Sequence, residues 1–169
     1  MGYVHDTQMA QFIPPTLMHP VAATNISFTA GSVSGTIAMH KAASAETLVV
    51  NIPITLPQNA AALKGGYVKT IELDYEITVL AATSVTAALN KVTRGADTSG
   101  LTVSSVTITQ DLTAATTAAT AAKHKLTITL TTPIWLLNTE YLLLKMSFVC
   151  PATTVLDILS AVVNYTLRA

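Results

Sequence analysis

The sequence contains one cysteine, Cys150, and few charged residues. A single thiol excludes an intramolecular disulfide and any metal site built from several cysteines. Charged residues make up only 11% of the chain, nine basic and nine acidic, and the basic ones are scattered along it. Proteins that neutralise phosphates need a basic excess or a basic stripe. We therefore expect no nucleic-acid partner.

Long apolar runs are also absent, although 50% of the 169 residues are hydrophobic. The uninterrupted apolar stretches are far shorter than the roughly 18 residues that a membrane-spanning helix needs, so no membrane partner is expected. So much apolar character with so little charge excludes intrinsic disorder. The length predicts one domain that buries roughly 70% of the surface of its unfolded chain.

Motifs that carry chemistry are lacking as well. The sequence has no glycine-rich phosphate loop, no HExxH zinc motif, no nucleophile elbow and no EF-hand loop. Its histidines are far apart in the sequence, which predicts no metal site: His5, His19, His40 and His124. We therefore expect no enzyme, no catalytic residue and no cofactor.

Residues suited to β-structure are abundant. Thr, Val and Ile make up about a third of the chain, and these β-branched residues favour strands. Apolar and polar residues alternate with period two in 69–79, 126–131 and 141–150, as in strands with one buried face. The first of these faces is predicted to hold Ile71, Leu73, Tyr75, Ile77 and Val79. Cys150 ends the apolar series of the third segment, so we expect it to pack in the core.

Weaker strands are expected at 25–30, 32–40, 46–56, 84–93 and 155–167, about eight or nine strands in all. In the last segment one face is predicted to hold Leu159, Ala161, Val163, Tyr165 and Leu167. Within 103–108 the alternation slips by one residue, which indicates a β-bulge or a strand that switches sheets. The connection at 59–65 is expected to form about one helical turn, and the Ala- and Thr-rich segment at 112–122 a short helix or a loop.

These patterns predict an all-β fold, an antiparallel two-sheet β-sandwich, with a jelly roll as the favoured variant. Residues 1–22 are predicted to form an extended N-terminal arm and residues 23–169 a single sandwich domain. Pro14, Pro15 and Pro20 are expected to keep the arm out of any regular ladder, so the domain should fold without it. The arm either packs across its own sandwich or lies on a neighbouring subunit, where five apolar side chains would support assembly: Met9, Phe12, Ile13, Leu17 and Met18.

Two features bear on ligand binding, and for each of them a structural role is favoured. Glu72, Asp74 and Glu76 stand about 7 Å apart on one strand face, where calcium binding or glycoside chemistry would use carboxylates. A solvated face is favoured instead, because a regular strand supplies few further calcium ligands and lysines can offset the charge: Lys69, Lys123, Lys125 and Lys145. The single tryptophan, Trp135, is expected to close one end of the sandwich, since aromatic residues are only 5% of the chain and make a poor sugar platform.

Five segments carry a resemblance to known proteins: GYVKTIELDYEI (66–77), AALNKV (87–92), KLTITLTTPIWL (125–136), EYLLL (140–144) and VVNYTLR (162–168). In this order they resemble small jelly-roll structural proteins from the virions of phages and environmental viruses. The resemblance spans about residues 66–169. It implies a non-enzymatic assembly subunit and assigns no site residues.

The leading hypothesis is a structural subunit of a virion or similar assembly, a capsid, decoration or tail-associated protein located in the extracellular particle. Its expected partners are copies of itself, as a trimer or larger ring, and other structural proteins. The alternative is an extracellular β-sandwich module that binds carbohydrate or a surface polymer, which a shallow groove lined by Trp135 and two tyrosines would favour. A third possibility is an enzyme, which a cluster of buried acids in a cleft would favour.

Overall fold

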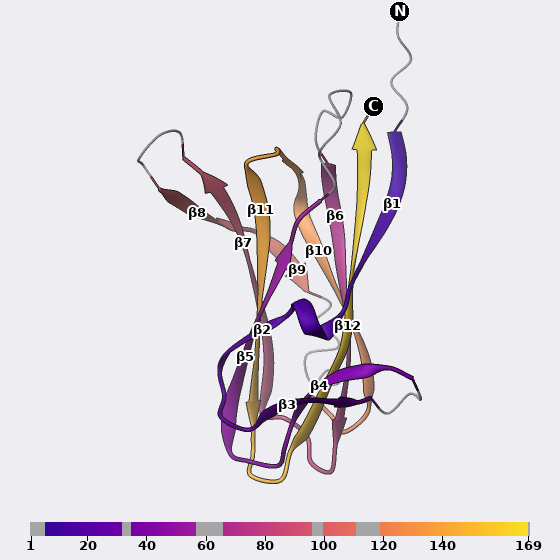
Figure 1. The fold of residues 1–169 in the computed structure, drawn as a ribbon, viewed down its shortest axis with the longest axis vertical. Helices are drawn as coiled ribbons and strands as arrows, with labels where there is room; N and C mark the ends of the chain where they lie inside the picture. Colours follow the sequence, from indigo (N-terminus) through magenta and orange to yellow (C-terminus); the bar gives the residue numbers. More distant parts are fainter. Residues whose placement is uncertain (1–5, 32–34, 57–65, 96–99, 111–118, 169) are drawn as a thin grey trace, which may run out of the picture.

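The computed structural model describes residues 6–31, 35–56, 66–95, 100–110 and 119–168, and within them twelve strands form two antiparallel sheets (Figure 1). Sheet A contains β1 (Asp6–Ile13), β3 (Ile26–Ala30), β4 (Ile37–Lys41), β6 (Gly66–Thr78), β9 (Ile108–Gln110), β10 (Lys123–Leu136) and β12 (Val155–Arg168). Sheet B contains β2 (His19–Ala22), β5 (Glu46–Ile54), β7 (Ser84–Arg94), β8 (Leu101–Val106) and β11 (Glu140–Cys150). The predicted all-β, two-sheet sandwich is confirmed.

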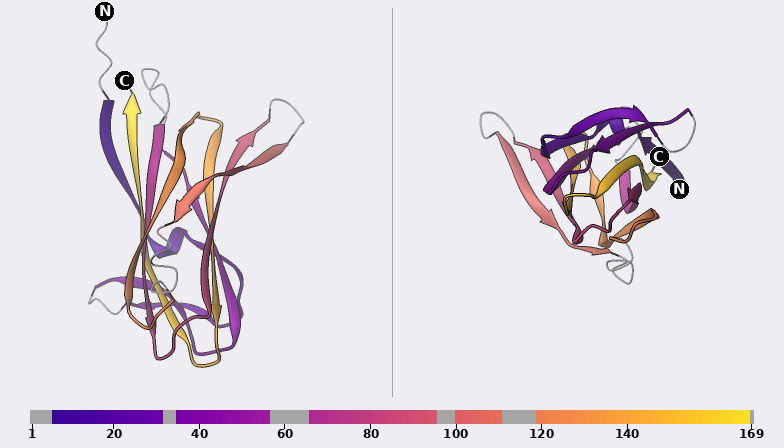
Figure 2. Two further views of the ribbon diagram at one scale, coloured as in Figure 1. Left: turned by 180° about the vertical axis from the view of Figure 1, so that it is seen from behind. Right: turned by 90° about the horizontal axis from the view of Figure 1, so that it is seen from below.

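The chain passes repeatedly from one sheet to the other. The strands of sheet A lie in the order β3-β4-β12-β6-β10-β9, with β1 also paired to β12, and those of sheet B in the order β2-β5-β11-β7-β8. Figure 2 shows the two layers from behind and from below. The slip of the alternation at 103–108 marks one such passage, because β8 ends in sheet B at Val106 and β9 begins in sheet A at Ile108.

The core lies between the sheets and is filled by the predicted alternating residues. In β11 every second residue is buried, from Leu142 to Cys150, and in β10 Leu126, Ile128 and Leu130 are buried. The Tyr75 ring of β6 meets the Phe148 ring edge-on at 5.2 Å. Burial raises the pKa of the Cys150 thiol, which agrees with its predicted place in the core.

One residue of the predicted β6 face lies elsewhere. Ile71, Leu73, Tyr75 and Ile77 are buried, but Val79 is 75% exposed. The strand ends at Thr78, and Val79 has a φ of 73°, in the left-handed region that a β-branched residue rarely adopts. The side chain therefore leaves the sheet at this turn.

A bulge in β12 changes which of its residues face the core. The pairing of β12 with β6 shifts register between Ile158 and Ser160. Before the shift Leu156 and Ile158 are buried, and after it Ala161 and Val163 are buried. The prediction that Leu159 shares a face with Ala161 is therefore wrong: Leu159 lies at the bulge and is only half-buried.

The N-terminal segment is part of the sandwich. All of β1 pairs with β12, and β2 pairs with β5. The prediction that prolines keep this segment out of the ladders is therefore wrong. Pro14 and Pro15 lie at the η1 turn (Pro15–Leu17) between the two strands, and Pro20 lies on an edge strand, where proline is tolerated.

The five apolar side chains of this segment divide into two groups. Ile13 and Met18 are 2% and 1% exposed and belong to the core of their own sandwich. Met9, Phe12 and Leu17 are 40%, 61% and 55% exposed. The segment thus contributes to the core and also presents apolar side chains to the outside. The predicted helical turn at 59–65 and most of 112–122 lie outside the described residues.

Candidate functional site

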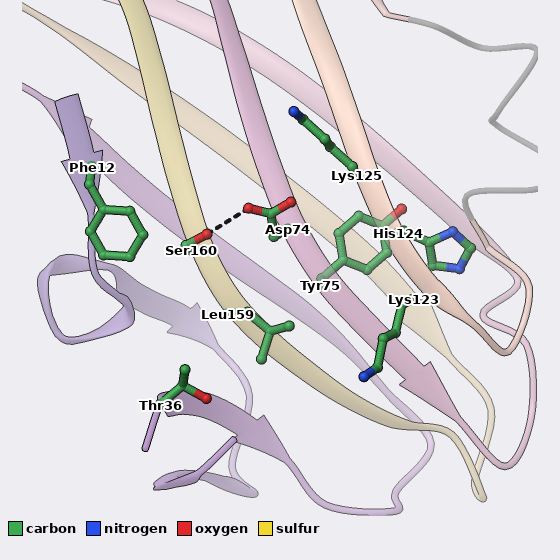
Figure 3. Close-up of a pocket in the computed structure, with 9 residues that line it drawn as sticks. All are labelled: Phe12, Thr36, Asp74, Tyr75, Lys123, His124, Lys125, Leu159 and Ser160. Carbon is green, nitrogen blue, oxygen red and sulfur yellow. Dashed lines mark hydrogen bonds between the residues drawn. The ribbon is translucent and has the colours of Figure 1, made fainter. Parts of the chain in front are cut away.

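A pocket of about 450 Å³ opens on the outer face of sheet A, where β12, β6 and β10 run side by side (Figure 3). Its lining comes from five segments of the chain: Phe12, Thr36, Asp74, Tyr75, Lys123, His124, Lys125, Leu159 and Ser160. Figure 3 shows Phe12 on one side, the three basic residues of β10 on the other, and Asp74, Leu159 and Ser160 between them. We call this feature the outer pocket.

The bulge of β12 shapes the outer pocket. It brings two consecutive residues, Leu159 and Ser160, to the pocket lining, where regular alternation would send one of them inward. The Ser160 hydroxyl donates a hydrogen bond of 2.7 Å to Asp74 Oδ2. Because Ser160 is only 7% exposed, this bond holds the carboxylate in a sheltered position.

The predicted acidic row runs along β6 beside this pocket. Lys125 Nζ lies 2.6 Å from Glu72 Oε2, and this hydrogen bond raises the pKa of Lys125. Lys123 stands opposite Glu76 in the register of β10 and β6. Two of the four predicted lysines are therefore next to the acids, whereas Lys145 lies on β11 in the other sheet.

Next to the acidic row of β6, a carboxylate on β12 is paired with a histidine on β4. Asp157 stands opposite Glu76 in the register, and its Oδ1 lies 2.6 Å from His40 Nδ1 on β4. Within the part of the chain that the structure describes, no three His, Cys, Asp or Glu side chains are grouped so that they could hold a metal ion. No helix among the described residues is long and apolar enough to span a membrane.

Trp135 lies on the outer face of sheet A. It alternates with the fully buried Leu136 in β10, is 36% exposed, and its ring lies 5.1 Å from that of Tyr67 at the paired position of β6. The prediction that Trp135 closes one end of the sandwich is therefore wrong, because β10 continues through this residue to Leu136. The aromatic pair is a second exposed feature of the face that holds the outer pocket.

The sheet edges differ in how well they are protected. Edge strands are commonly protected against pairing with another chain because they are short or contain proline or charged residues. In sheet A, β9 has three residues, and in sheet B, β2 contains Pro20. The other end strands, β3 and β8, contain neither charged residues nor proline. The hairpin of β7 and β8 splays away from the rest of the sandwich (Figures 1 and 2).

Apolar side chains are exposed on these two strands. Leu101 and Val103 on β8 are each 64% exposed, and Phe28 on β3 is 49% exposed. Sequence reasoning named apolar residues of the N-terminal segment but missed these three. The available signal was the absence of any charge in two segments that were expected to be strands.

Comparisons with known proteins add little to this picture. No protein-family model and no curated protein matches the chain. Among solved structures, an arabinose-bound α-L-arabinofuranosidase (MgGH51) is similar, with 7% sequence identity and a TM-score of 0.42 over 88% of this chain and 23% of that chain. The chain thus spans less than a quarter of that structure's length. A TM-score below 0.5 identifies neither a family nor an activity.

Proposed function

We propose that the chain is a non-enzymatic structural subunit of a virion or a similar assembly, such as a capsid, decoration or tail-associated protein. The observation that carries this proposal is the pair of uncharged edge strands, β3 and β8. Unpaired backbone groups at a sheet edge readily bind a strand of another chain. Edge strands that lack charged residues and proline therefore favour association between subunits.

The strand order supports the proposal that this sandwich is a jelly roll. Four strands of sheet A lie in the order β4-β12-β6-β10, and four of sheet B in the order β5-β11-β7-β8. A jelly roll likewise has eight strands in two sheets, and it occurs in viral capsid proteins as well as in lectins. The proposed location is the virion.

The proposed partners are other copies of the chain, in a trimer or larger ring, and further structural proteins of the particle. In the N-terminal segment Met9 and Leu17 expose apolar surface outside the outer pocket, as do Val103 and Phe28 on the edge strands. Burying such side chains between subunits is favourable by roughly 1.5 to 3 kcal/mol each when burial is complete. The near-zero net charge leaves little electrostatic repulsion to oppose association.

Multi-angle light scattering tests this proposal. One chain has a mass of 17.7 kDa. At micromolar protein concentration we expect the purified protein to have at least three times this mass. A lysine at either free edge, as in Val103→Lys or Phe28→Lys, should lower that mass. The matched control is Thr86→Lys, at an exposed position of β7 outside its pairing with β8. A monomer at every concentration, with and without candidate partner proteins, would overturn the proposal.

One observation favours the second candidate, a module that binds carbohydrate or a surface polymer. The outer pocket combines an exposed aromatic ring with hydrogen-bonding groups of both kinds. Of the groove expected for such a module, with Trp135 and two tyrosines, the described residues provide the pair of Trp135 and Tyr67.

A further inference from the structure

We propose that the outer pocket binds a neutral saccharide, with Phe12 packing against a sugar ring while Asp74 and the lysines of β10 hydrogen-bond to its hydroxyl groups. This inference deepens the second candidate function and rests on it, and it does not depend on the assembly role. Three features of the pocket lead to this ligand class.

The first feature is the mixture of charges. Acids of β6 and lysines of β10 stand opposite one another, with Lys125 paired to Asp74 and Lys123 paired to Glu76 in the register. In the lining itself the charge of Asp74 offsets that of Lys123. Lys125 is paired with Glu72 at 2.6 Å, so the pocket presents little net charge to attract an anionic or a cationic ligand. A hydroxyl group both donates and accepts hydrogen bonds, so a neutral ligand rich in hydroxyls can use both sets.

The second feature is an apolar surface at one side of the pocket. The Phe12 ring is 61% exposed, and the half-buried Leu159 lies between it and the basic residues (Figure 3). Sugar rings carry C–H groups on one face and hydroxyls around the rim. A ring that lies on Phe12 would thus direct its hydroxyls toward the polar groups of β6 and β10.

The third feature is a carboxylate that is already positioned. Ser160 donates to Asp74 Oδ2 at 2.7 Å, and a carboxylate has about four acceptor sites, so this bond orients the group without filling it. A group held in place before binding loses little conformational freedom when the ligand arrives. Sequence reasoning named Phe12 and Asp74 separately, and the pairing of β1, β12 and β6 brings their strands together.

Saturation-transfer NMR, which detects weak binding and tolerates large assemblies, tests the site on the intact protein. The neutral probes are cellotetraose, maltotetraose and xylotetraose. The charged probes are tetragalacturonic acid and the glucosamine tetramer. We expect at least one neutral probe to bind with a dissociation constant below about 10 mM and both charged probes to bind more weakly.

Variants locate the binding on the protein. Phe12→Ala and the isosteric Asp74→Asn should each weaken binding of that probe by about tenfold. Leu137→Ala, which removes a side chain that is 52% exposed, outside the pocket and not assigned to assembly, should leave it unchanged. Asp74→Asn leaves the apolar side chains proposed for assembly intact, so light scattering on the same samples separates the two roles. The proposal is overturned if no neutral probe binds, if a charged probe binds more tightly, or if the pocket variants do not differ from the control.

Discussion

Ser160 donates a hydrogen bond of 2.7 Å to the carboxylate of Asp74, and this bond joins β12 to β6 directly beside the bulge at Leu159. Bulges interrupt a ladder and leave a residue unpaired. A side-chain bond next to the interruption helps to fix the register on both sides of it. The same bond shapes the outer pocket, so the register of β12 and the geometry of the pocket are linked.

Loss of this hydroxyl should therefore destabilise the fold. Ser160→Ala removes a hydrogen bond to a charged group, and we expect the free energy of unfolding to fall by about 1 to 2 kcal/mol. Urea denaturation measures the change. Ser27→Ala, at an exposed position of β3, is the control and should change stability by less than about 0.5 kcal/mol. Equal effects of the two variants would show that the bond has no role in stability.

A buried lysine ties together two loops. Lys41 is 0% exposed, and its ammonium donates to the carbonyl oxygens of Ala42 at 3.0 Å, Ser44 at 2.8 Å and Thr154 at 3.3 Å. Glu46 Oε1 lies 3.9 Å away and supplies a negative charge. These bonds connect the turn between β4 and β5 to the loop between β11 and β12.

Lys41→Met keeps much of the side-chain volume but leaves these carbonyl groups without their donor. We expect the free energy of unfolding to fall by about 3 kcal/mol, because a buried group that loses a charged partner retains its desolvation cost. Thermal and urea unfolding measure this change. Lys69→Met, at an exposed position of β6, should have almost no effect. A Lys41→Met protein as stable as the wild type would contradict the structure of this cluster.

The pH dependence of stability should show a contribution from Glu46. A hydrogen bond of 2.7 Å from the Ser44 hydroxyl and one of 3.0 Å from the Thr24 N–H hold the pKa of Glu46 below its usual value. Because the folded state has the lower pKa, this contribution is full above the pKa of the unfolded chain. It is lost as the pH falls through the pKa of the folded state.

We therefore expect Glu46→Gln to reduce the free energy of unfolding by up to about 1 kcal/mol at pH 7. The difference from the wild type should shrink as the pH falls below 4.5, the ordinary pKa of a glutamate side chain. Denaturation curves at a series of pH values give both quantities. A difference that stays constant over this range would show that the carboxylate charge is not responsible.

The sequence predicts the core well wherever alternation is regular. The buried faces of β6, β10 and β11 can be predicted from the alternation of apolar and polar residues alone, because one side of each strand packs in the core and the other faces solvent. The position of Leu159 could not be predicted in this way. It fits the alternation of the residues that follow it, and the bulge appears only when β12 is paired with β6. Bulges depend on the partner strand, which local sequence does not reveal.

The N-terminal segment shows a second limit of local reasoning. Its prolines predict breaks in a ladder, but in the structure they lie between β1 and β2 or on an edge strand. The partner of β1 is β12, at the other end of the chain. The outer pocket has the same origin, since Phe12, Asp74 and Ser160 lie far apart in the sequence and meet only through strand order.

The N-terminal side chains allow a test that separates folding from assembly. Ile13 and Met18 are almost fully buried in the core, so Ile13→Ala and Met18→Ala should each lower the free energy of unfolding by about 2 to 4 kcal/mol. Met9 and Leu17 are 40% and 55% exposed, so Met9→Ala and Leu17→Ala should change the stability of the isolated subunit by less than about 1 kcal/mol.

The same four variants should affect association in the reverse order. Burial of the Met9 and Leu17 side chains against a neighbouring subunit would favour the assembly, so their removal should lower the mass seen by light scattering while the circular dichroism spectrum remains of the β type. If all four variants are equally destabilised, this segment serves the fold alone. If Ile13→Ala and Met18→Ala have the stability of the wild type, β1 and the turn after it do not pack on their own sandwich in solution.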